Sequence, residues 1–379
     1  MGEPASPSLR RSRSPPNDAT CESREEPPAK RTGIRGFFAA GEAQRPPERT
    51  PSVWPPFRDD ALLCVDLFCG IGGWSTGARL AGHKIVLAVD SDPVIMKLHM
   101  MNHPDTAHKV MKLGDDTEDE LVGLIRSFIP EGSRWCLHGS PPCQTISSIQ
   151  RIMPTQHRPD SAVGLDLAAW YLRFVTRIQP TYWTFEDVVH PELDGALRLF
   201  RCLYPEIMQY SKVDCADYGV CQHRKRMLAG SPSIMQTFFT DPSLRQQHPL
   251  LRDVLQLPEG AAFQRSSAGR NPDTSQNVLE ADGSYSNPTV RRDVRPVDAI
   301  SWTCMARHPH AYLRHDLSVI RDQTPRETAL LQTFPSTYKL PKQSFSNFVL
   351  QKGAGNALPP LVARKMLQGF SGAAASVSS

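Results

Sequence analysis

Cys143 has the sequence surroundings of a nucleophile. It follows two prolines in the segment 139–144, Gly-Ser-Pro-Pro-Cys-Gln, just after an apolar run at 135–138 that predicts a strand. Proline fixes φ and lacks an N–H, so this segment should turn out of the sheet instead of extending the strand. A cysteine on such a turn, at the carboxyl edge of an α/β sheet, is placed to attack a carbon atom. Considered alone, such a cysteine is more often a buried structural thiol.

Three further elements carry groups that could work with this thiol. Glu186 ends an apolar run, and residues 222–226, Gln-His-Arg-Lys-Arg, open a later predicted strand. Arg224 and Arg226 alternate along that strand and should therefore point to one face. The turn 355–359, Gly-Asn-Ala-Leu-Pro, leads into another helix. A thiolate, an acid and a guanidinium at one sheet edge suit attack on an electron-poor ring, because the acid can neutralise a ring nitrogen and the arginine can hold a carbonyl oxygen.

A glycine-rich turn at 66–73, Asp-Leu-Phe-Cys-Gly-Ile-Gly-Gly, joins the first predicted strand to a helix. A dinucleotide-binding turn would need a third glycine at position 75, where serine stands, so NAD is disfavoured. Asp66 at the strand end suits a ligand with a cationic amino group, as in S-adenosylmethionine. Asp90 ends the second strand and could accept from ribose hydroxyls, and Asp115 is expected to end the third and accept from an adenine amino group. The alternative is that the glycines only make a tight turn.

Short apolar runs alternate with helical patterns through the middle of the chain. This alternation predicts an α/β fold with a doubly wound, mostly parallel sheet. The expected strands are 62–67, 84–89, 135–138, 182–185 and 226–229, and the expected helices include 94–101, 121–128 and 165–178. Thr324 and Pro325 are residue types that favour the N-cap and the first helical position, so another helix should begin there.

The pattern predicts a catalytic region that is interrupted by a smaller inserted domain. The N-terminal segment is rich in proline, serine and arginine and poor in aliphatic residues, which favours disorder. The alternation of strands and helices stops in a polar stretch that contains many Pro, Gly, Asn and Arg residues. The predicted parts are a disordered tail (1–59), a catalytic and cofactor-binding domain (60–231), the smaller domain (232–318), the C-terminal part of the catalytic domain (319–370) and a disordered tail (371–379).

Composition narrows the class of protein. The chain has 43 basic and 39 acidic residues and a net charge of +4, which permits nucleic-acid binding without requiring it. No apolar run approaches the roughly 20 residues of a membrane-spanning helix. The nine cysteines lack the spacing of a zinc site, so no metal is predicted and a reduced, intracellular protein is the simplest interpretation.

Taken together, the motifs resemble those of the cytosine-5 DNA methyltransferase family, in a short form of eukaryotic appearance. The matching elements are DLFCGIGG (66–73), GSPPCQ (139–144), FEDV (185–188), QHRKR (222–226), TPRETALLQTFP (324–335) and GNALPP (355–360). They occur in the family's order, and only the joint match is specific. The resemblance implies the S-adenosylmethionine-dependent methyltransferase fold, with residues 232–318 as a target-recognition domain.

The resemblance also implies a chemistry for the site. Cys143 would attack C6 of cytosine and form a covalent adduct, Glu186 would donate to N3, and Arg226, with Arg224 as a second candidate, would hold the base. The base would be flipped out of double-stranded DNA, because C6 cannot be reached within the stack. The cofactor contacts implied for S-adenosylmethionine are Asp66, Phe68, Gly70, Gly72, Gly73, Asp90, Asp115 and Asn356.

Two departures from the family pattern leave alternatives open. The family usually has asparagine where Asp187 follows Glu186, and a carboxylate there would raise the proton affinity of Glu186 if the two came close. Cys221 stands where proline is usual. The alternatives are a transfer-RNA methyltransferase of the same family, whose Cys-Phe-Thr element is not matched at 302–305, and a catalytically weak nucleic-acid-binding partner.

The N-terminal tail contains one apolar island. Ile34, Phe37 and Phe38 have the spacing of a peptide that binds the replication sliding clamp, although arginine stands in place of the usual glutamine. The alternative is that they anchor the tail to the enzyme or have no role. Basic pairs at 10–11 and 30–31 are candidates for a nuclear signal, which favours the nucleus, or are simply solvated charges.

Overall fold

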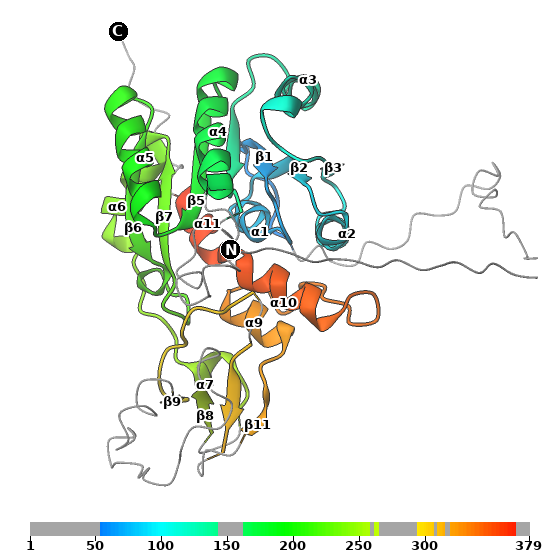
Figure 1. Cartoon of the computed structure of the whole chain (residues 1–379), viewed down its shortest axis with the longest axis vertical. Helices are drawn as coiled ribbons and strands as arrows, with labels where there is room; N and C mark the ends of the chain where they lie inside the picture. Colours follow the sequence, from blue (N-terminus) through cyan, green and yellow to red (C-terminus); the bar gives the residue numbers. More distant parts are fainter. Residues whose placement is uncertain are drawn as a thin grey trace, which may run out of the picture. The chain divides into compact units, whose positions relative to one another are not determined.

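A seven-stranded sheet forms the centre of the molecule, and its strand order reverses between β1 and β4 (Figure 1). The first five strands in the order are parallel, and β7 is inserted antiparallel between β5 and β6. The order is β3 (Ala107–Val110), β2 (Lys84–Asp90), β1 (Leu63–Leu67), β4 (Trp135–Gly139), β5 (Tyr182–Val188), β7 (Lys225–Gly230), β6 (Gln209–Asp214). Ligands of doubly wound sheets bind beyond the carboxyl ends of the strands at such a reversal.

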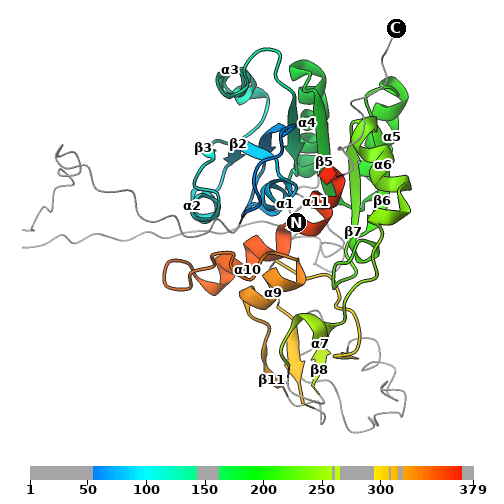
Figure 2. The ribbon, with the colours of Figure 1, turned by 180° about the vertical axis from the view of Figure 1, so that it is seen from behind.

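Helices cover both faces of this sheet, because alternate residues of each strand are apolar on either side. Val65 and Leu67 face one cluster, together with Phe174, whereas Cys64 faces the other, together with Trp74. The first face carries α3 (Glu118–Phe128), α4 (Ala162–Ile178) and α5 (Pro191–Leu203), and the second carries α1 (Gly73–Leu80), α6 (Pro232–Thr240) and α11 (Pro360–Gln368). Figure 1 shows α4 and α5 (green), and Figure 2 gives the reverse view, with α11 in red.

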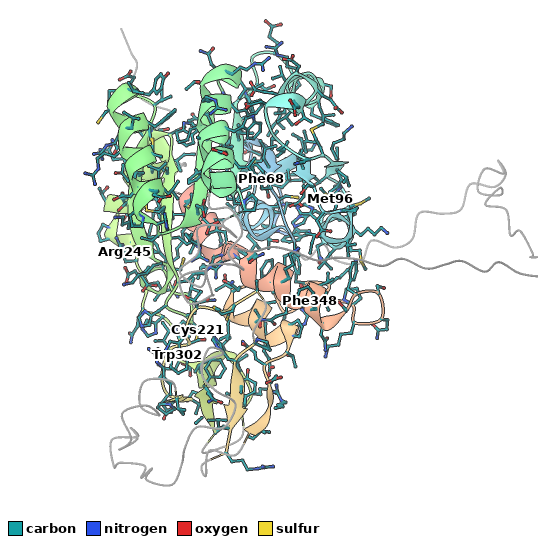
Figure 3. All side chains as sticks on the ribbon, in the orientation of Figure 1. Phe68, Met96, Cys221, Arg245, Trp302 and Phe348 are labelled. Carbon is teal, nitrogen blue, oxygen red and sulfur yellow. The ribbon has the colours of Figure 1, made fainter. Side chains whose placement is uncertain are left out.

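A smaller antiparallel sheet lies beyond α9 and α10 in both views (Figures 1 and 2). Its order is β11 (Val319–Asp322), β10 (Ala311–Leu313), β8 (Ala262–Gln264), β9 (Val294–Pro296). Phe263 and Tyr312 of this sheet pack with Cys221 and Trp302, which are labelled in Figure 3. The neighbouring helices are α7 (Leu251–Val254), α9 (Pro325–Leu331) and α10 (Asn347–Asn356), and α2 (Pro93–Asn102) lies next to β2 and β3.

The described residues of this computed structural model are 54–142, 162–257, 261–264, 294–306, 309–314 and 319–368. Within them, no helix is both long and apolar enough to cross a membrane. The five strands expected from the sequence are all present, and α9 begins as expected, with a capping box between Thr324 and Glu327. The predicted α/β class with a mostly parallel sheet is confirmed.

Several expected boundaries differ from the observed ones. Helix α6 begins at Pro232, the first residue assigned to the smaller domain, but it packs on the large sheet, because Ile234, Met235 and Phe238 are buried in the cluster on that sheet. Strand β11 begins after position 318 but pairs with β10 of the small sheet. Residues 54–59, assigned to the disordered tail, contact α1, where Arg79 donates to the Pro55 carbonyl at 2.6 Å and stacks on Phe57.

Candidate active site

A cavity of ≈ 210 Å³ lies at the carboxyl ends of β1, β2, β4 and β5. It therefore occupies the position at which the strand order reverses. Residues that are distant in sequence line it: Asp66, Phe68, Cys69, Gly70, Ile71, Gly73, Trp74, Asp90, Ser91, Asp92, Ile95, Ser140, Pro141, Pro142, Glu186, Asp187, Val188, Arg226, Lys352, Gly353, Asn356, Ala357 and Leu358. Six of the eight predicted cofactor residues are in this set.

The turn after β1 is shaped by backbone conformations that are rare outside glycine. Phe68 has φ 58°, Gly70 has φ 54° and Gly72 has φ 92°. A non-glycine residue in the left-handed region is uncommon and is often found at functional sites. A Cβ on Gly73 would lie 2.3 Å from the Leu358 carbonyl oxygen, so only glycine lets the turn approach the 355–358 segment this closely.

Asp90 is held in a fixed orientation at the end of β2. One of its carboxylate oxygens accepts from the Gly70 N–H at 2.9 Å, and the other accepts from the Asp92 N–H at 2.9 Å. Burial raises the pKa of Asp90, and the two N–H groups counteract that rise. Each carboxylate oxygen can accept a second hydrogen bond. Asp90 can therefore still bind a hydroxyl group that enters the cavity.

Asp66 places an unusual carboxyl group at the cavity. Its Oδ2 accepts from Ser75 Oγ at 2.6 Å, whereas Oδ1 is buried and has no partner among the described residues. Burial raises the pKa of Asp66 to about 7. Trp74 also lines the cavity, and its buried indole Nε1 has no partner in this part of the chain. One free acceptor and one free donor fit a ligand with both an amino group and a carboxylate, such as the methionine part of S-adenosylmethionine.

Glu186 and Arg226 form an ion pair at the junction of β5 and β7. The Glu186 Oε1 atom lies 2.6 Å from Arg226 Nε, and the residues are only 5% and 8% exposed. Arg226 is opposite Val188 in the ladder, two positions from Glu186, so both side chains share one face. Hydrogen bonding of this kind fixes both groups at the cavity wall. The pair can present a carboxyl group and a guanidinium to the same bound molecule.

Asp187 points to the opposite face of β5, toward the cluster that contains Met227 and Ala229. Its Oδ1 accepts from the Val188 N–H at 2.6 Å, and its buried Oδ2 has no partner among the described residues. Burial raises the pKa of Asp187 well above its ordinary value, and the nearby charge of Glu186 adds to this rise. A neutral carboxylic acid is close in shape and charge to the asparagine usual in the family.

Arg224 is not among the residues that line the cavity, in contrast to Arg226. It is 0% exposed, and its guanidinium donates to the carbonyls of Gly355 at 3.0 Å and Ala357 at 2.9 Å. A further bond of 3.4 Å reaches the carbonyl of Cys304. Arg224 directly precedes the first residue of β7. Its role is to tie the end of α10 to the strand that carries Arg226.

Gly72 and Asp115, two of the eight predicted cofactor residues, lie outside the cavity lining. A Cβ on Gly72 would meet His99 and His103 instead of the cavity. Asp115 does not end a strand: it belongs to η1 (Asp115–Thr117), is exposed, and pairs with Arg173 at 3.0 Å. The sequence carries no signal that distinguishes such a turn from a strand end.

The prediction for Cys143 lies outside the described residues, which stop at Pro142 on this side of the gap. Ser140, Pro141 and Pro142 line the cavity, and Cys143 is joined to Pro142 by a peptide bond. The island of Ile34, Phe37 and Phe38 also lies outside the described residues.

Trp74 and Lys352 are among the lining residues that the sequence analysis did not single out. Trp74 directly follows the glycine pair, and its ring stacks on His138 with centroids 4.6 Å apart. Lys352 precedes Asn356 by four residues and so shares its face of α10. Its Nζ lies 3.5 Å from Asp92 Oδ2. The helical spacing to Asn356 could have identified Lys352, whereas Trp74 had no distinguishing spacing.

A doubly wound sheet with an antiparallel β7, an acidic residue at the end of each of the first two strands and a cavity above them defines the class of S-adenosylmethionine-dependent methyltransferases. Residues 62–371 match the family described as C-5 cytosine-specific DNA methylase, and the chain belongs to this family. It is thus a DNA cytosine-5 methyltransferase that acts on double-stranded DNA with S-adenosylmethionine as methyl donor.

Individual relatives agree with this family. The chain is 27% identical over 307 residues to the type II methyltransferase M.HgiDI of Herpetosiphon aurantiacus, and the match covers 79% of this chain and 90% of that protein. It is 26% identical to the type II methyltransferase M.NgoPII of Neisseria gonorrhoeae over 82% of this chain and 94% of the relative. A DNMT2 mutant of Spodoptera frugiperda has a similar fold, with a TM-score of 0.53, 15% identity and coverage of 82% and 99%.

Proposed function

We propose that Cys143 is the nucleophile and that Glu186 and Arg226 activate the cytosine ring. Addition of the Cys143 thiolate to C6 forms the S–C6 bond and pushes electron density toward C5. Protonation of N3 by Glu186 neutralises the charge that this addition would otherwise leave on the ring. Arg226, fixed 2.6 Å from Glu186, holds the ring carbonyl oxygen. The ion pair inside the cavity lining is the observation that carries this proposal.

Bound S-adenosylmethionine supplies the methyl group that C5 receives. Loss of the C5 proton and cleavage of the S–C6 bond then restore the aromatic ring and the Cys143 thiolate. Asp66 and Trp74 would bind the amino acid part of the cofactor, and Asp90 would bind the ribose. Phe68, Gly70, Gly73 and Asn356 line the same cavity and would complete the contact surface.

A cytosine in paired DNA cannot reach this site, since the cavity is set among the strand ends. The target base is therefore proposed to be flipped out of the helix, which costs a few kcal/mol of stacking and pairing. The small sheet and its connections correspond to the target-recognition domain that was predicted at 232–318. They are proposed to recognise the bases next to the flipped cytosine. The segment 222–226 contacts that region through Cys304, so target recognition would be joined directly to Arg226.

Methyl transfer from labelled cofactor to unmodified DNA, hemimethylated DNA and transfer RNA tests the substrate. Wild-type protein should label DNA, and Cys143→Ala should abolish the labelling because no S–C6 bond can form. Cys202→Ala is a matched control, since Cys202 is an exposed thiol on α5. Equal labelling by Cys143→Ala and wild type would reject the nucleophile. Labelling of transfer RNA alone would favour that branch of the family.

The N-terminal tail is proposed to direct the enzyme to its place of action. Ile34, Phe37 and Phe38 have the spacing of a sliding-clamp-binding peptide, and the basic pairs suit nuclear import. Capture of the full chain by an immobilised clamp should be lost when Phe37 and Phe38 are both replaced by alanine. A fluorescent fusion should accumulate in the nucleus and lose this localisation when residues 1–53 are removed. Equal capture or unchanged localisation would reject the respective role.

A further inference from the structure

A line of hydrogen bonds runs from Asp66 at the cavity to His108 on β3. Ser75 Oγ lies 2.6 Å from Asp66 Oδ2 and 3.3 Å from His99 Nε2. The other ring nitrogen of His99, Nδ1, lies 2.8 Å from His108 Nε2. Ser75 and His99 are fully buried, whereas His108 is partly exposed. The line therefore connects a buried carboxyl group with a histidine that is partly exposed to solvent.

Gly72 makes room for this arrangement. A Cβ at this position would lie 3.0 Å from two atoms of the His99 ring and 2.8 Å from His103. The glycine of the cofactor turn thus lets the imidazole of His99 approach the helix that carries Ser75. This explains why Gly72 belongs to the cofactor turn although it does not line the cavity.

The number of available hydrogens fixes the direction of the line. A serine hydroxyl has one hydrogen, and a neutral imidazole has one donor and one acceptor nitrogen. If Asp66 is ionised, Ser75 must donate to it, and Ser75 Oγ then accepts from His99 Nε2. His99 Nδ1 consequently has no hydrogen and accepts from His108. All donors point toward the carboxylate.

We propose that Ser75, His99 and His108 are positioning residues that keep Asp66 ionised for the amino group of S-adenosylmethionine and exchange its proton with solvent. The proposal rests on the role assigned above to Asp66. Its structural basis is the continuity of the three hydrogen bonds and the position of Asp66, whose Oδ1 has no partner among the described residues, in the cavity lining. Cofactor affinity would then depend on pH through residues that never touch the cofactor.

When Asp66 is protonated, donor and acceptor exchange places in every hydrogen bond of the line. Asp66 Oδ2 then donates to Ser75, Ser75 donates to His99 Nε2, and His99 Nδ1 donates to His108. Conversion to the ionised state breaks the O–H bond on Asp66 and the N–H bond on His99 Nδ1. It forms an N–H bond on His99 Nε2 and one on His108 Nε2, with Ser75 exchanging one hydrogen for another. The net result is one proton moved from Asp66 to His108, which can release it to water.

The surrounding groups favour a neutral relay. Burial lowers the pKa of His99 well below its ordinary value, and the charges of His103 and His108 lower it further. Burial also lowers the pKa of His108, whereas the hydrogen bond that its ring donates to the Thr106 backbone carbonyl raises this pKa. The other titratable and charged groups around the line are Asp90, Arg79, Cys64, Cys69, Cys136, Tyr171 and Tyr338.

Calorimetric titration of S-adenosylmethionine into DNA-free protein from pH 6 to 8.5 tests the proposal. The wild-type Kd should rise as pH falls, about tenfold for each pH unit below the Asp66 pKa, because a protonated Asp66 must lose its proton to bind a cation. His108→Leu removes the donor to His99, so Ser75 is free to donate to His99 instead of Asp66. The Kd at pH 7 should rise about tenfold, and the profile should move to higher pH. Ser75→Ala should act in the same direction.

Three variants separate the possible failures. His108→Gln keeps an N–H donor toward His99 and should restore the wild-type profile, and His248→Leu, a partly exposed histidine outside the line, should not change it. Profiles of His108→Leu and wild type that coincide would overturn the proposal, as would a His108→Gln profile that shifts as far as that of His108→Leu. Asp66→Asn should flatten the pH dependence. A wild-type profile in Asp66→Asn would instead reject the role of Asp66 in the proposed function.

Discussion

The large and small sheets differ in how their positions are secured. Strands of the large sheet have four to seven residues, and both of its faces are covered by helices. Strands of the small sheet have three or four residues. A short strand contributes few ladder bonds and little buried area, so the small sheet depends more on individual side chains.

The seam between the two regions, where residues 222–224 meet Cys304, Leu331 and the end of α10, shows this dependence on individual side chains. Gln222 is fully buried, and its amide accepts from the Cys304 N–H at 2.9 Å and donates to the Leu331 carbonyl at 3.0 Å. Arg224 adds its bonds to Cys304 and to the end of α10. The comparison teaches that the chemistry is held mainly by backbone pairing, whereas at the seam two buried polar side chains add to a few backbone bonds, such as that from the His223 N–H to the Ser301 carbonyl at 3.0 Å.

The largest effect is expected at Glu186, where the large sheet carries the proposed chemistry. Glu186→Gln cannot protonate N3, so methyl transfer should fall about 10²–10⁴-fold. Cofactor affinity, measured by calorimetry, should change little because Asp66 and Asp90 are unaffected. Glu192→Gln, an exposed residue of α5, is the matched control. Wild-type rates in Glu186→Gln would remove this residue from the mechanism.

Substitution of Asp66 tests whether the buried carboxylate of the proposed site lowers the stability of the large sheet. Burial raises the pKa of Asp66 from 3.8 in the unfolded chain to about 7 in the folded protein. The folded protein is therefore most stable below pH 4, where Asp66 is neutral in both states, and this stability is lost as the pH rises through 7. Asp66→Asn should therefore raise the unfolding free energy of the cofactor-free protein by about 4 kcal/mol at pH 8. The gain should vanish near pH 3, as measured by urea unfolding. A pH-independent difference would contradict this account.

Arg224→Met tests the seam. The carbonyls of Gly355 and Ala357 would lose their buried donor, and the unfolding free energy should fall by about 3 kcal/mol. Burial lowers the pKa of Arg224 only to about 10, so the loss should be the same at pH 6 and pH 8. Arg245→Met, whose side chain is 45% exposed, should cost under about 0.5 kcal/mol. An equal fall in the unfolding free energy for both substitutions would mean that Arg224 stabilises the protein no more than an exposed arginine does.

Asp187→Asn is expected to have the smallest effect. Burial raises the pKa of the Asp187 carboxyl group well above its ordinary value and so favours the neutral form, which the amide resembles in shape and charge. Methyl transfer between pH 6 and 8 should stay within about threefold, or under 1 kcal/mol. A loss above tenfold would show that an ionised Asp187 takes part in the reaction and would place it with Glu186.

The sequence predicted the large sheet better than the small one for physical reasons. A strand buried on both faces, such as β1, leaves a continuous apolar run, whereas the strands of the small sheet are too short to show a period. The acids at strand ends, Asp66 and Asp90, were predicted because parallel strands bring their carboxyl ends to one edge.

The remaining parts of the site depend on contacts that local patterns do not encode. Arg224 binds backbone carbonyls of the 355–357 segment instead of lining the cavity, and Asp115 lies in a short turn and not at a strand end. The line from Ser75 to His108 joins residues from α1, α2 and β3, and no spacing along the chain reveals that they meet. Trp74 was missed for the same reason.

The packing of α11 against α1 has a consequence for biosynthesis. A Cβ on Gly77 of α1 would lie 2.5 Å from Ala363 of α11, so the two helices are in close contact. They lie near opposite ends of the described part of the chain. A ribosome delivers α1 long before α11, and contacts of such long sequence separation form late. During that interval the apolar face of α1 has no cover. Newly made protein should therefore depend on chaperones until its last helix emerges, and truncation before residue 360 should yield aggregates.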